Sequence, residues 1–586
     1  ACCVGLRALV WPGAWRLGGR RPRSSSEVAP LIRERILNRK KTGADVLDIH
    51  SLLVRPDPRR SLAKSYKTLG LLGAGGFGSV YRVQYLPTEE ERAIKMIQKP
   101  TDPAEFTRVL VEVETLVRLD HPNIEKFYEF FEDRHVICLV TELCSGGNMG
   151  ELDPAVDTSE EIRDLFRDLL AAVTYCHSEG VTHRDLKFDN CLLTLKEGRH
   201  RRTTKVIDFG LSSVSRPGAE GECMQEPVGT AYFIAPEVLA SSENNCLTYG
   251  PKCDMWSIGV MMYIVYTDQH PFSSAAVDVS QIIERILKDG VRIGPLEEAA
   301  VEDPVQDLVL ALLAKDPGRR LSAKEALSHP FFSGADGSDL GSPGSLGRVC
   351  SPKPSVKSLT SLFSRVCSFA HFSRLERAVL TIVAHDARQR EIRDLESAFK
   401  SLDIDKAGWL TRDGICQALN SRGIRLRDNE VEAAFEALDP DGDDKVQYTD
   451  WLAATIRPSF ITSERALREV WHFFDIHGVG KVFLADIAEV LGEDMVSLEL
   501  PEGLRVGEGG EIAWESFQKL LTHVAANLQR SVDAQVEHDD QSRRASRRWM
   551  HSLASRRVAS SVRYPRGRAH PVSDWSEILR QRSKSR

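Results

Sequence analysis

Apolar positions in the first half of the chain alternate between strand-like and helix-like spacing. Residues 66–72 and 80–85 have the apolar-rich pattern of strands and flank a glycine-rich turn, and residues 92–97 form a third such run. After Pro103, residues 106–119 repeat apolar side chains at helical spacing, and proline suits the first turn of a helix. The pattern predicts an ordered domain that mixes strands and helices.

Further along, the hydrophobic pattern changes twice. Residues 258–265 are almost wholly apolar, which predicts a buried helix, and no run reaches the roughly 18 apolar residues that a membrane span needs. Residues 333–368 begin with a stretch rich in Gly, Ser and Pro that is typical of a linker. We therefore place the end of the first domain at residue 332.

A repeat follows the linker. Asp403, Asp439 and Asp475 open similar segments 36 residues apart, and a weaker fourth copy begins at Arg505. A regular period of this size indicates repeated supersecondary units. We predict an all-helical domain over residues 393–528.

Composition and charge indicate that the two terminal segments of the chain differ from the domains between them. The chain of 586 residues has a net charge of −7, yet its last 46 residues hold thirteen Lys and Arg against two acidic residues. We expect residues 529–586 to be a disordered basic tail and residues 1–65 a basic, disordered segment, with a transit peptide as the alternative for the latter. The 12 Cys are scattered without any C-x-x-C, which favours a reducing compartment and argues against a disulfide scaffold or a Cys-based zinc site.

Six short motifs occur in a fixed order within residues 66–332. A G-x-G-x-x-G-x-V loop lets the backbone come close to phosphate oxygens, and a lysine two strands later can hold them. A glutamate on the following helix can pair with that lysine. The motifs are Gly73 to Val80, Ala93-Ile-Lys95, Glu112, His183-Arg-Asp185-Leu-Lys187-Phe-Asp-Asn190, Asp208-Phe-Gly210 and Ala235-Pro-Glu237.

On these motifs residues 66–332 resemble a eukaryotic-type Ser/Thr protein kinase, which implies a bilobal fold. The resemblance makes Asp185 the catalytic base, and Lys187 the residue that steadies the transferred phosphoryl group. It makes Asn190 and Asp208 the magnesium ligands, and Lys95, held by Glu112, the partner of the ATP phosphates. It also implies that Asp254 braces the catalytic loop and that Arg320 pairs with Glu237.

The same resemblance assigns the nucleotide pocket. Thr141 takes the gatekeeper position, and the backbone groups of Glu142 and Cys144 face adenine. The full set of implied ATP-binding residues is Leu72, Gly73, Ala74, Gly75, Gly76, Phe77, Gly78, Val80, Ala93, Lys95, Thr141, Glu142 and Cys144.

Two further positions depart from the family pattern. Asn148 stands where many basophilic relatives carry an acidic residue, which leaves open how strongly the kinase selects Arg in its substrates. Glu226 replaces the usual activation-loop Thr, and we expect its carboxylate to pair with Arg184.

The second repeat matches a calcium-binding EF-hand loop, in which oxygens at positions 1, 3, 5, 7, 9 and 12 surround the ion. Its ligand candidates are Asp439, Asp441, Asp443, the carbonyl of Lys445, and Asp450 at position 12. Position 6 is Asp444 instead of glycine, and Asp tolerates the left-handed conformation that this position needs. We expect one main calcium site here. Asp450 is shorter than the usual Glu, which predicts either a lowered calcium affinity or a shift of preference toward magnesium.

The other three loops have lost ligands. The first keeps Asp403 and Asp405 but has Ala407 and Gly414, the third keeps Asp475 and Asp486 but has His477 and Val479, and the fourth runs from Arg505 to Ser516. Position 8 is nevertheless apolar in every loop, at Leu410, Val446, Val482 and Ile512. We therefore predict that the loops still pair through short strands where chelation is weak or lost.

Together the two halves resemble the calcium-dependent protein kinases of plants and apicomplexan parasites. The implied fold is α+β: a bilobal kinase, a junction helix at residues 369–392, and an all-α calmodulin-like domain. The family restrains its kinase through the junction until calcium acts. Two interpretations of the junction remain open, that it restrains the kinase or that it only packs on its own EF-hand lobe.

The resemblance implies ATP, Mg²⁺ and Ca²⁺ as cofactors and proteins with Ser/Thr acceptors, in a basic context, as substrates. We expect a cytoplasmic location and no nucleic-acid partner, and leave peripheral membrane association, for example through acylated Cys2 and Cys3, open. Two alternatives are a kinase whose EF-hands are a calcium-insensitive scaffold and a non-catalytic docking protein. Intact Lys95, Asp185 and Asp208 argue against the second.

Overall fold

The computed structural model describes most of the chain between residues 62 and 530. The described residues are 62–75, 78–132, 135–194, 201–214, 231–243, 249–273, 278–333, 356–423, 428–439, 442–491, 504–530 and 533. The chain divides into two units at residue 531, and the second unit is described only at residue 533. The predicted disordered ends therefore lie almost wholly outside the described residues.

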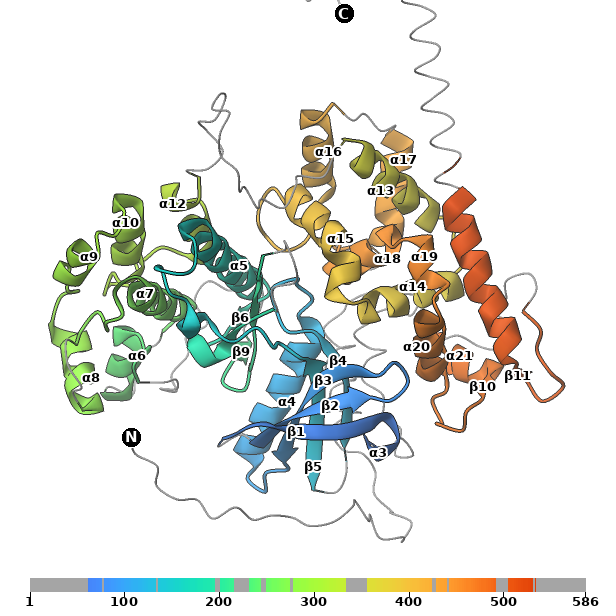
Figure 1. The fold of residues 1–586 in the computed structure, drawn as a ribbon, viewed down its shortest axis with the longest axis horizontal. Helices are drawn as coiled ribbons and strands as arrows, with labels where there is room; N and C mark the ends of the chain where they lie inside the picture. Colours follow the sequence, from blue (N-terminus) through green and yellow to red (C-terminus); the bar gives the residue numbers. More distant parts are fainter. Residues whose placement is uncertain are drawn as a thin grey trace, which may run out of the picture. The chain divides into compact units, whose positions relative to one another are not determined.

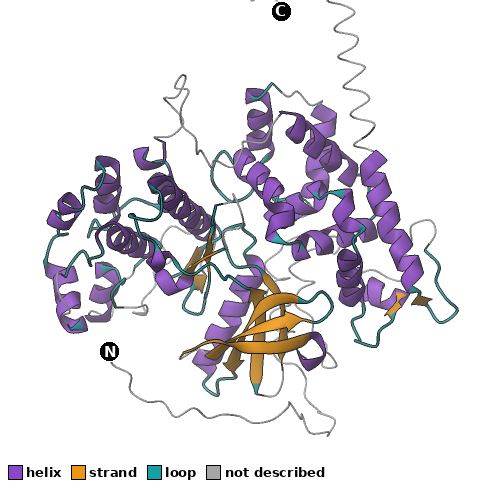
Figure 2. Cartoon of the chain, viewed as in Figure 1, coloured by secondary structure: helices purple, strands orange, loops and turns teal. Residues whose placement is uncertain are grey.

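The first lobe is built on one antiparallel sheet with the strand order β1-β2-β3-β5-β4 (Figures 1 and 2). Its elements are α3 (Leu62–Ser65), β1 (Tyr66–Gly75), β2 (Gly78–Tyr85), β3 (Glu90–Gln98), α4 (Pro103–Arg118), β4 (Phe127–Glu132) and β5 (Val136–Glu142). The three predicted strands and the predicted helix are all present. The side chain of Asp102 caps α4 by accepting a hydrogen bond from the amide of Glu105 at 2.9 Å.

The two faces of the sheet have different surroundings. One face joins α4 in the main hydrophobic core, where Ile97, Val113 and Leu139 are buried together. The other face has its own smaller cluster, which includes Tyr66, Val83, Tyr85, Ile94 and Val140. Side chains on alternate positions of β3 therefore point either toward the nucleotide side or toward this second cluster.

The second lobe is mainly helical. Its elements are η1 (Met149–Glu151), α5 (Ser159–Ser178), β6 (Val181–Thr182), η2 (Phe188–Asn190), β7 (Cys191–Leu193), β8 (Thr204–Val206), β9 (Ser213–Val214), α6 (Pro236–Glu243), α7 (Lys252–Thr267), α8 (Val279–Lys288), α9 (Gly294–Glu298), α10 (Asp303–Leu312), α11 (Ala323–Leu327) and α12 (Pro330–Ser333). The predicted buried helix at 258–265 is the centre of α7, where Trp256 and Met261 are fully buried.

The remaining described residues form the helical EF-hand part. Its elements are α13 (Val356–Phe369), α14 (Arg374–Asp386), α15 (Gln389–Leu402), α16 (Arg412–Ser421), α17 (Asp428–Leu438), α18 (Tyr448–Thr455), α19 (Pro458–Ile461), α20 (Glu464–Phe474), β10 (Val482–Phe483), α21 (Leu484–Leu491) and β11 (Glu511–Ile512), and residues 514–530 are also helical. The predicted α+β fold class, with a mixed lobe before an all-α domain, is confirmed.

Two predicted boundaries differ from the structure. The linker predicted for 333–368 ends in a helix, α13, because Leu359, Leu362, Phe363 and Val366 recur at helical spacing and are buried. The junction helix predicted for 369–392 is interrupted: α14 ends at Asp386, Ala387 is extended, and α15 begins after Arg388. The interruption is fixed locally, because the amide of Arg388 donates to the carboxylate of Glu391 at 3.0 Å and so starts a new helix.

Among the described residues, no helix combines the length and the apolar character that crossing a bilayer requires.

Candidate active site and calcium loops

The glycine-rich turn is a tight hairpin between β1 and β2, in which Gly75 faces Gly78. Gly78 has φ +129°, and a Cβ placed there would lie 2.1 Å from the carbonyl oxygen of Met96, so no other residue fits. Gly76 and Phe77 lie outside the described residues. The strand register places Val80 opposite Lys95, and Ala93 opposite both Arg82 and Thr141. Residues opposite one another share a face of the sheet, so Val80, Ala93, Lys95 and Thr141 line one side.

The remaining adenine candidates occupy the connection after β5. The amide of Glu142 already donates to the carbonyl of Lys126 at 2.8 Å, and its carboxylate pairs with Lys205 at 2.8 Å. An adenine contact by Glu142 must therefore go through its carbonyl group. Burial raises the pKa of the Cys144 thiol well above its usual value, which keeps that side chain neutral.

Lys95 is held between two carboxylates. Its Nζ lies 2.6 Å from Oε1 of Glu112 and 2.7 Å from Oδ1 of Asp208, so the predicted ion pair with Glu112 is present. Burial lowers the pKa of Lys95, but the two carboxylates outweigh burial and hold that pKa above its usual value. Burial likewise raises the pKa of Asp208, and the facing ammonium of Lys95 more than reverses that effect. Both groups are therefore charged at neutral pH.

The catalytic-loop residues lie together. The Nζ of Lys187 lies 2.7 Å from Oδ2 of Asp185, and Nδ2 of Asn190 donates to the carbonyl oxygen of Asp185 at 2.8 Å. Because that amide nitrogen is engaged, Oδ1 is the atom with which Asn190 could face a cation. The amide of Ile207 donates to the carbonyl of Asn190 at 3.0 Å, which ties this loop to the segment that carries Asp208.

Buried anchors hold the loop in place. Oxygens of Asp254 accept hydrogen bonds from the amides of His183 at 3.0 Å and Arg184 at 2.8 Å, as predicted. Arg320 pairs with Glu237 through two hydrogen bonds of 2.6 and 2.9 Å, also as predicted. The Nε of Arg184 donates to the carbonyl of Leu211 at 2.6 Å. Glu226, its predicted partner, lies outside the described residues.

Two residues of the site have strained backbones. Arg184 has φ +69° and Asp208 has φ +62°, a region that costs a residue other than glycine about 1–3 kcal/mol. Such conformations persist only where surrounding contacts hold them. For Asp208 one of these contacts comes from Glu125, whose Oε1 accepts a hydrogen bond from the Asp208 amide at 2.9 Å. Sequence reasoning missed Glu125, because it stands beside Lys126 as one of two neighbouring charged residues and no local pattern marks it.

The second calcium loop is closed around Asp439. Its two carboxylate oxygens accept hydrogen bonds from the amides of Asp443 at 3.1 Å and Asp444 at 2.8 Å. Asp444 has φ +61°, so the left-handed turn predicted at position 6 is present. Asp450 lies in the first turn of α18, where a position-12 ligand belongs, and Asp441 lies outside the described residues. The described carboxylates and the carbonyl of Lys445 are hard oxygen donors, which suits calcium.

The loops pair as position 8 predicts. Leu410 and Val446 exchange two backbone hydrogen bonds of 3.0 and 2.8 Å, and β10 pairs with β11 through Val482 and Ile512. In the third loop His477 stands at a ligand position and its Nε2 lies 3.3 Å from Oδ1 of Asp486. The pairing of loops is therefore kept both in the pair that contains the predicted calcium loop and in the pair whose loops lack most of the usual ligand residues.

The first EF-hand pair also contacts the kinase lobes, which the sequence did not reveal. Nζ of Lys445, at position 7 of the second loop, lies 3.1 Å from Oε1 of Glu179, just after α5. The amide and hydroxyl of Thr449, at position 11, donate to Asp120 at 2.7 and 2.9 Å. A Cβ on Gly408, at position 6 of the first loop, would lie 2.6 Å from the ring of Tyr175.

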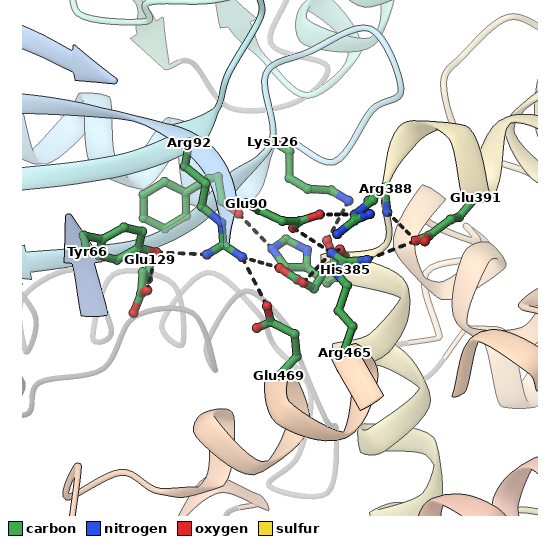
Figure 3. A network of polar contacts seen from close by, with 12 residues as sticks. Tyr66, Glu90, Arg92, Lys126, Glu129, His385, Arg388, Glu391, Arg465 and Glu469 are labelled. Carbon is green, nitrogen blue, oxygen red and sulfur yellow. Dashed lines mark hydrogen bonds and ion pairs between the residues drawn. The ribbon is translucent and has the colours of Figure 1, made fainter. Parts of the chain in front are cut away.

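A second contact joins β3 to the junction and to the second EF-hand pair (Figure 3). Arg92 is buried between the rings of Tyr85 and Tyr128, each centred 4.0 Å from its guanidinium carbon, and it pairs with Asp386 at 2.5 Å. Arg465 of α20 reaches both Glu90 at 2.7 Å and Asp386 at 2.8 Å. We call this set of residues the Arg92 network.

Comparison with known proteins places this geometry in a family. The protein kinase domain model matches residues 66–332, and the EF-hand domain pair model matches residues 392–456. Calcium-dependent protein kinase 17 of Arabidopsis thaliana is 32% identical over 74% of this chain and 78% of its own length. Calcium-dependent protein kinase 34 of the same plant is 32% identical over 74% and 79%, and calcium-dependent protein kinase 20 of Oryza sativa subsp. japonica is 28% identical over 80% and 83%.

Proposed function

The chain belongs to the calcium-dependent protein kinases, and on this premise we propose that the cleft transfers the γ-phosphoryl group of ATP to Ser and Thr hydroxyls of proteins. The observation that carries the proposal is the position of Lys95, 2.6 Å from Glu112 and 2.7 Å from Asp208. This is the arrangement in which a lysine can hold phosphates on one side of a metal-binding carboxylate. This set of paired charges supports an active kinase over a non-catalytic docking protein.

We assign the steps to the chain's own residues. Asp185 accepts the proton of the acceptor hydroxyl. Lys187, whose Nζ lies 2.7 Å from Oδ2 of Asp185, stabilises the negative charge of the phosphoryl group during its transfer. Lys95 holds the α- and β-phosphates, and Glu112 positions Lys95. Asn190 and Asp208 would hold Mg²⁺, which when bound neutralises charge on the phosphates.

We assign nucleotide enclosure to the sheet of the first lobe and to the connection after β5. The backbone of residues 73–78 covers the phosphates, and Leu72, Val80 and Ala93 close over the base. Thr141 borders the pocket at the back, with the backbone groups of Glu142 and Cys144 at the adenine edge. The strand register that puts Val80, Ala93 and Thr141 on one face supports this assignment.

We further propose that substrates present basic residues near the acceptor. Asn148 caps η1 by accepting a hydrogen bond from the amide of Gly150 at 2.8 Å, and Glu151 in the same turn is exposed. Glu151 can supply the carboxylate that Asn148 lacks.

A cytoplasmic location fits the seven cysteines that the structure describes, all of which are free thiols.

An activity assay with a catalytic variant tests the proposed reaction. Asp185→Asn should remove nearly all transfer of radiolabelled phosphate from ATP to a Ser/Thr peptide while leaving the melting temperature and ADP binding unchanged. Asp307→Asn, on an exposed side chain of α10, is the matched control and should transfer phosphate at the wild-type rate. Full turnover in Asp185→Asn would refute the assignment of the catalytic base.

We propose that calcium acts through the contact between the EF-hand pairs and the kinase lobes. The polar contacts of α14 with the kinase go to the outer face of β3 and to residues 126–127: Nε2 of His385 lies 2.9 Å from the carbonyl oxygen of Phe127, and Nζ of Lys126 donates to the carbonyl of His385 at 2.6 Å. The rest of α14 packs on α18 and α20. This supports the interpretation in which the junction packs on its own EF-hand domain.

The second calcium loop links ion binding to that contact. Lys445 and Thr449 belong to the same twelve residues as the ligands Asp439 and Asp450, and both contact the kinase. A ligand that fixes the loop must therefore also fix or shift its kinase contacts. Kinase activity measured with calcium and with chelator tests this, and equal activities would refute calcium control while leaving the reaction assignment intact.

A further inference from the structure

Glu125 lies where the rear of the cleft meets the magnesium-binding segment. It precedes β4 and is partly buried, and its Oε1 accepts the hydrogen bond from the amide of Asp208 at 2.9 Å. Thr141 of β5 lies close enough to this carboxyl group to act on it. The residue therefore contacts both the gatekeeper position and the first residue of the Asp-Phe-Gly motif, and none of the roles assigned above includes it.

The backbone around Glu125 pairs by hydrogen bonds with β8, the strand that leads into Asp208. The amide of Glu125 donates to the carbonyl of Val206 at 2.9 Å, and the amide of Val206 donates to the carbonyl of Asn123 at 2.9 Å. Ile124 and Val206 thus form a parallel bridge two residues before Asp208. The side chain of Asn123 strengthens the register by donating to the carbonyl of Thr204 at 2.9 Å. The carboxylate is consequently placed by backbone pairing and not by a flexible loop.

Asp208 needs such a partner. Its φ of +62° is unfavourable, and its carboxylate is turned toward Lys95 at 2.7 Å. If the backbone relaxed to an ordinary conformation, the carboxylate would leave Lys95 and the position assigned to magnesium. The hydrogen bond that the Asp208 amide donates to Oε1 of Glu125, at 2.9 Å, opposes this relaxation, because a backbone that turned away would lose it.

We propose that Glu125 is a positioning residue for phosphoryl transfer, which holds the backbone of Asp208 so that the Asp208 carboxylate stays aimed at Lys95 and the bound nucleotide. The inference rests on the proposed function, because it concerns a residue assigned there to magnesium. The inference predicts that the rate of phosphoryl transfer depends on an acceptor oxygen at position 125. An apolar side chain of similar length fills the space without supplying one.

Glu125→Met and Glu125→Gln separate these two properties. We expect Glu125→Met to lower kcat about tenfold, the effect of losing one such hydrogen bond, with a smaller change in the KM for ATP. It should also raise the Mg²⁺ concentration needed for half-maximal rate. Glu125→Gln keeps an acceptor oxygen and should recover most of the rate. Glu132→Gln, which removes a carboxylate paired with Lys99 at the far end of β4, is the matched control and should leave kcat and the Mg²⁺ dependence unchanged.

Two measurements do not depend on turnover. Calorimetry should show weaker binding of ADP to Glu125→Met in the presence of Mg²⁺ and unchanged binding in EDTA. Amide hydrogen exchange over residues 206–210 should be faster in Glu125→Met than in the wild type and in Glu125→Gln. If Glu125→Met fails to fold, Glu125→Val is compared in the same way.

The outcomes distinguish this inference from the proposed function. Wild-type kcat, Mg²⁺ dependence and exchange in a folded Glu125→Met would overturn the positioning role, and so would equal losses in the Met and Gln variants. An inactive wild-type enzyme would instead overturn the proposed function, and the calorimetric and exchange comparisons would still decide the role of Glu125.

Discussion

The two EF-hand pairs have the same backbone arrangement but differ in the side chains at their calcium-ligand positions. In both pairs the position-8 residues join through backbone hydrogen bonds, and position 6 of every loop has positive φ, at Gly408, Asp444, Gly480 and Gly510. Only the first pair offers a loop with carboxylates at most ligand positions. In the second pair Nε2 of His477 lies 3.3 Å from Oδ1 of Asp486, across the third loop. Loop pairing in this chain therefore depends on the left-handed turn and the apolar strand, and the ligand set can be lost without losing the fold.

The pairs also contact the kinase in different ways. The first pair uses its loops, through Gly408, Lys445 and Thr449, so ligand positions and contact positions alternate along one segment. The second pair uses a helix, through Arg465 and Glu469 of α20, away from its loops (Figure 3). The difference suggests that the first pair senses calcium while the second serves as a constant anchor, and the predictions below test this division.

The largest expected difference is in calcium binding. Asp439→Ala should abolish most of the heat of a calcium titration, because it removes the position-1 ligand and the acceptor that closes the loop. Asp475→Ala, the same change at position 1 of the third loop, should remove little. Wild-type heat after Asp439→Ala, or three or four tight sites in the wild type, would contradict the assignment of one main loop.

The next effect concerns position 6. Gly408→Ala and Gly480→Ala both place a side chain at positive φ, which costs about 1–3 kcal/mol in each case. At Gly480 nothing lies within 4 Å of the new Cβ, whereas at Gly408 the Tyr175 ring lies 2.6 Å away and adds about 1–3 kcal/mol of overpacking. Urea unfolding of the full chain should therefore show a larger loss for Gly408→Ala. Equal losses would mean that the first loop does not contact α5 in solution.

A smaller effect is expected at position 7. Lys445 pairs with Glu179 across the contact with the kinase, with side chains that are 26% and 18% exposed, while Lys481 pairs with Glu511 inside the second pair, at 61% and 50%. Double-mutant cycles to Ala should give a coupling of about 1 kcal/mol for the first pair and a few tenths for the second. Only the first cycle should change the calcium concentration for half-maximal kinase activity. A shift of that concentration in the Lys481 cycle would contradict the proposed division.

The smallest effect is a pH dependence of the Arg92 network. Burial and the nearby charge of Asp386 raise the pKa of Glu469 well above its usual value, although the charges of Arg92 and Arg465 oppose this. Because the pKa is raised by the contact, protonated Glu469 favours the contact, and the contact should weaken as pH rises from about 4.5 through the raised value. Glu469→Gln should remove this dependence in hydrogen exchange of β3. An unchanged pH profile in that variant would assign the effect to another group.

Much of the cleft could be predicted because its residues belong to local motifs. The pairings of Lys95 with Glu112 and of Leu410 with Val446 follow from the motifs and the repeat, and the bracing of the catalytic loop by Asp254 follows from the family resemblance. The structure has each of them. The positive φ of Asp444 was predicted from the tolerance of its side chain. The chemical roles of these residues remain proposals.

Sequence alone determined the order of the domains, the motifs of the cleft and the loss of calcium ligands, because each is encoded in residues a few positions apart. Only the tertiary structure decided where Glu125 and Arg92 act. Glu125 meets Asp208 across 83 residues, and Arg92 meets Asp386 across 294, so no local pattern marks either pair. The strand register and the packing of α14 bring these groups together. Charged residues that resemble ordinary surface residues in the sequence thus contact distant parts of the chain in the fold.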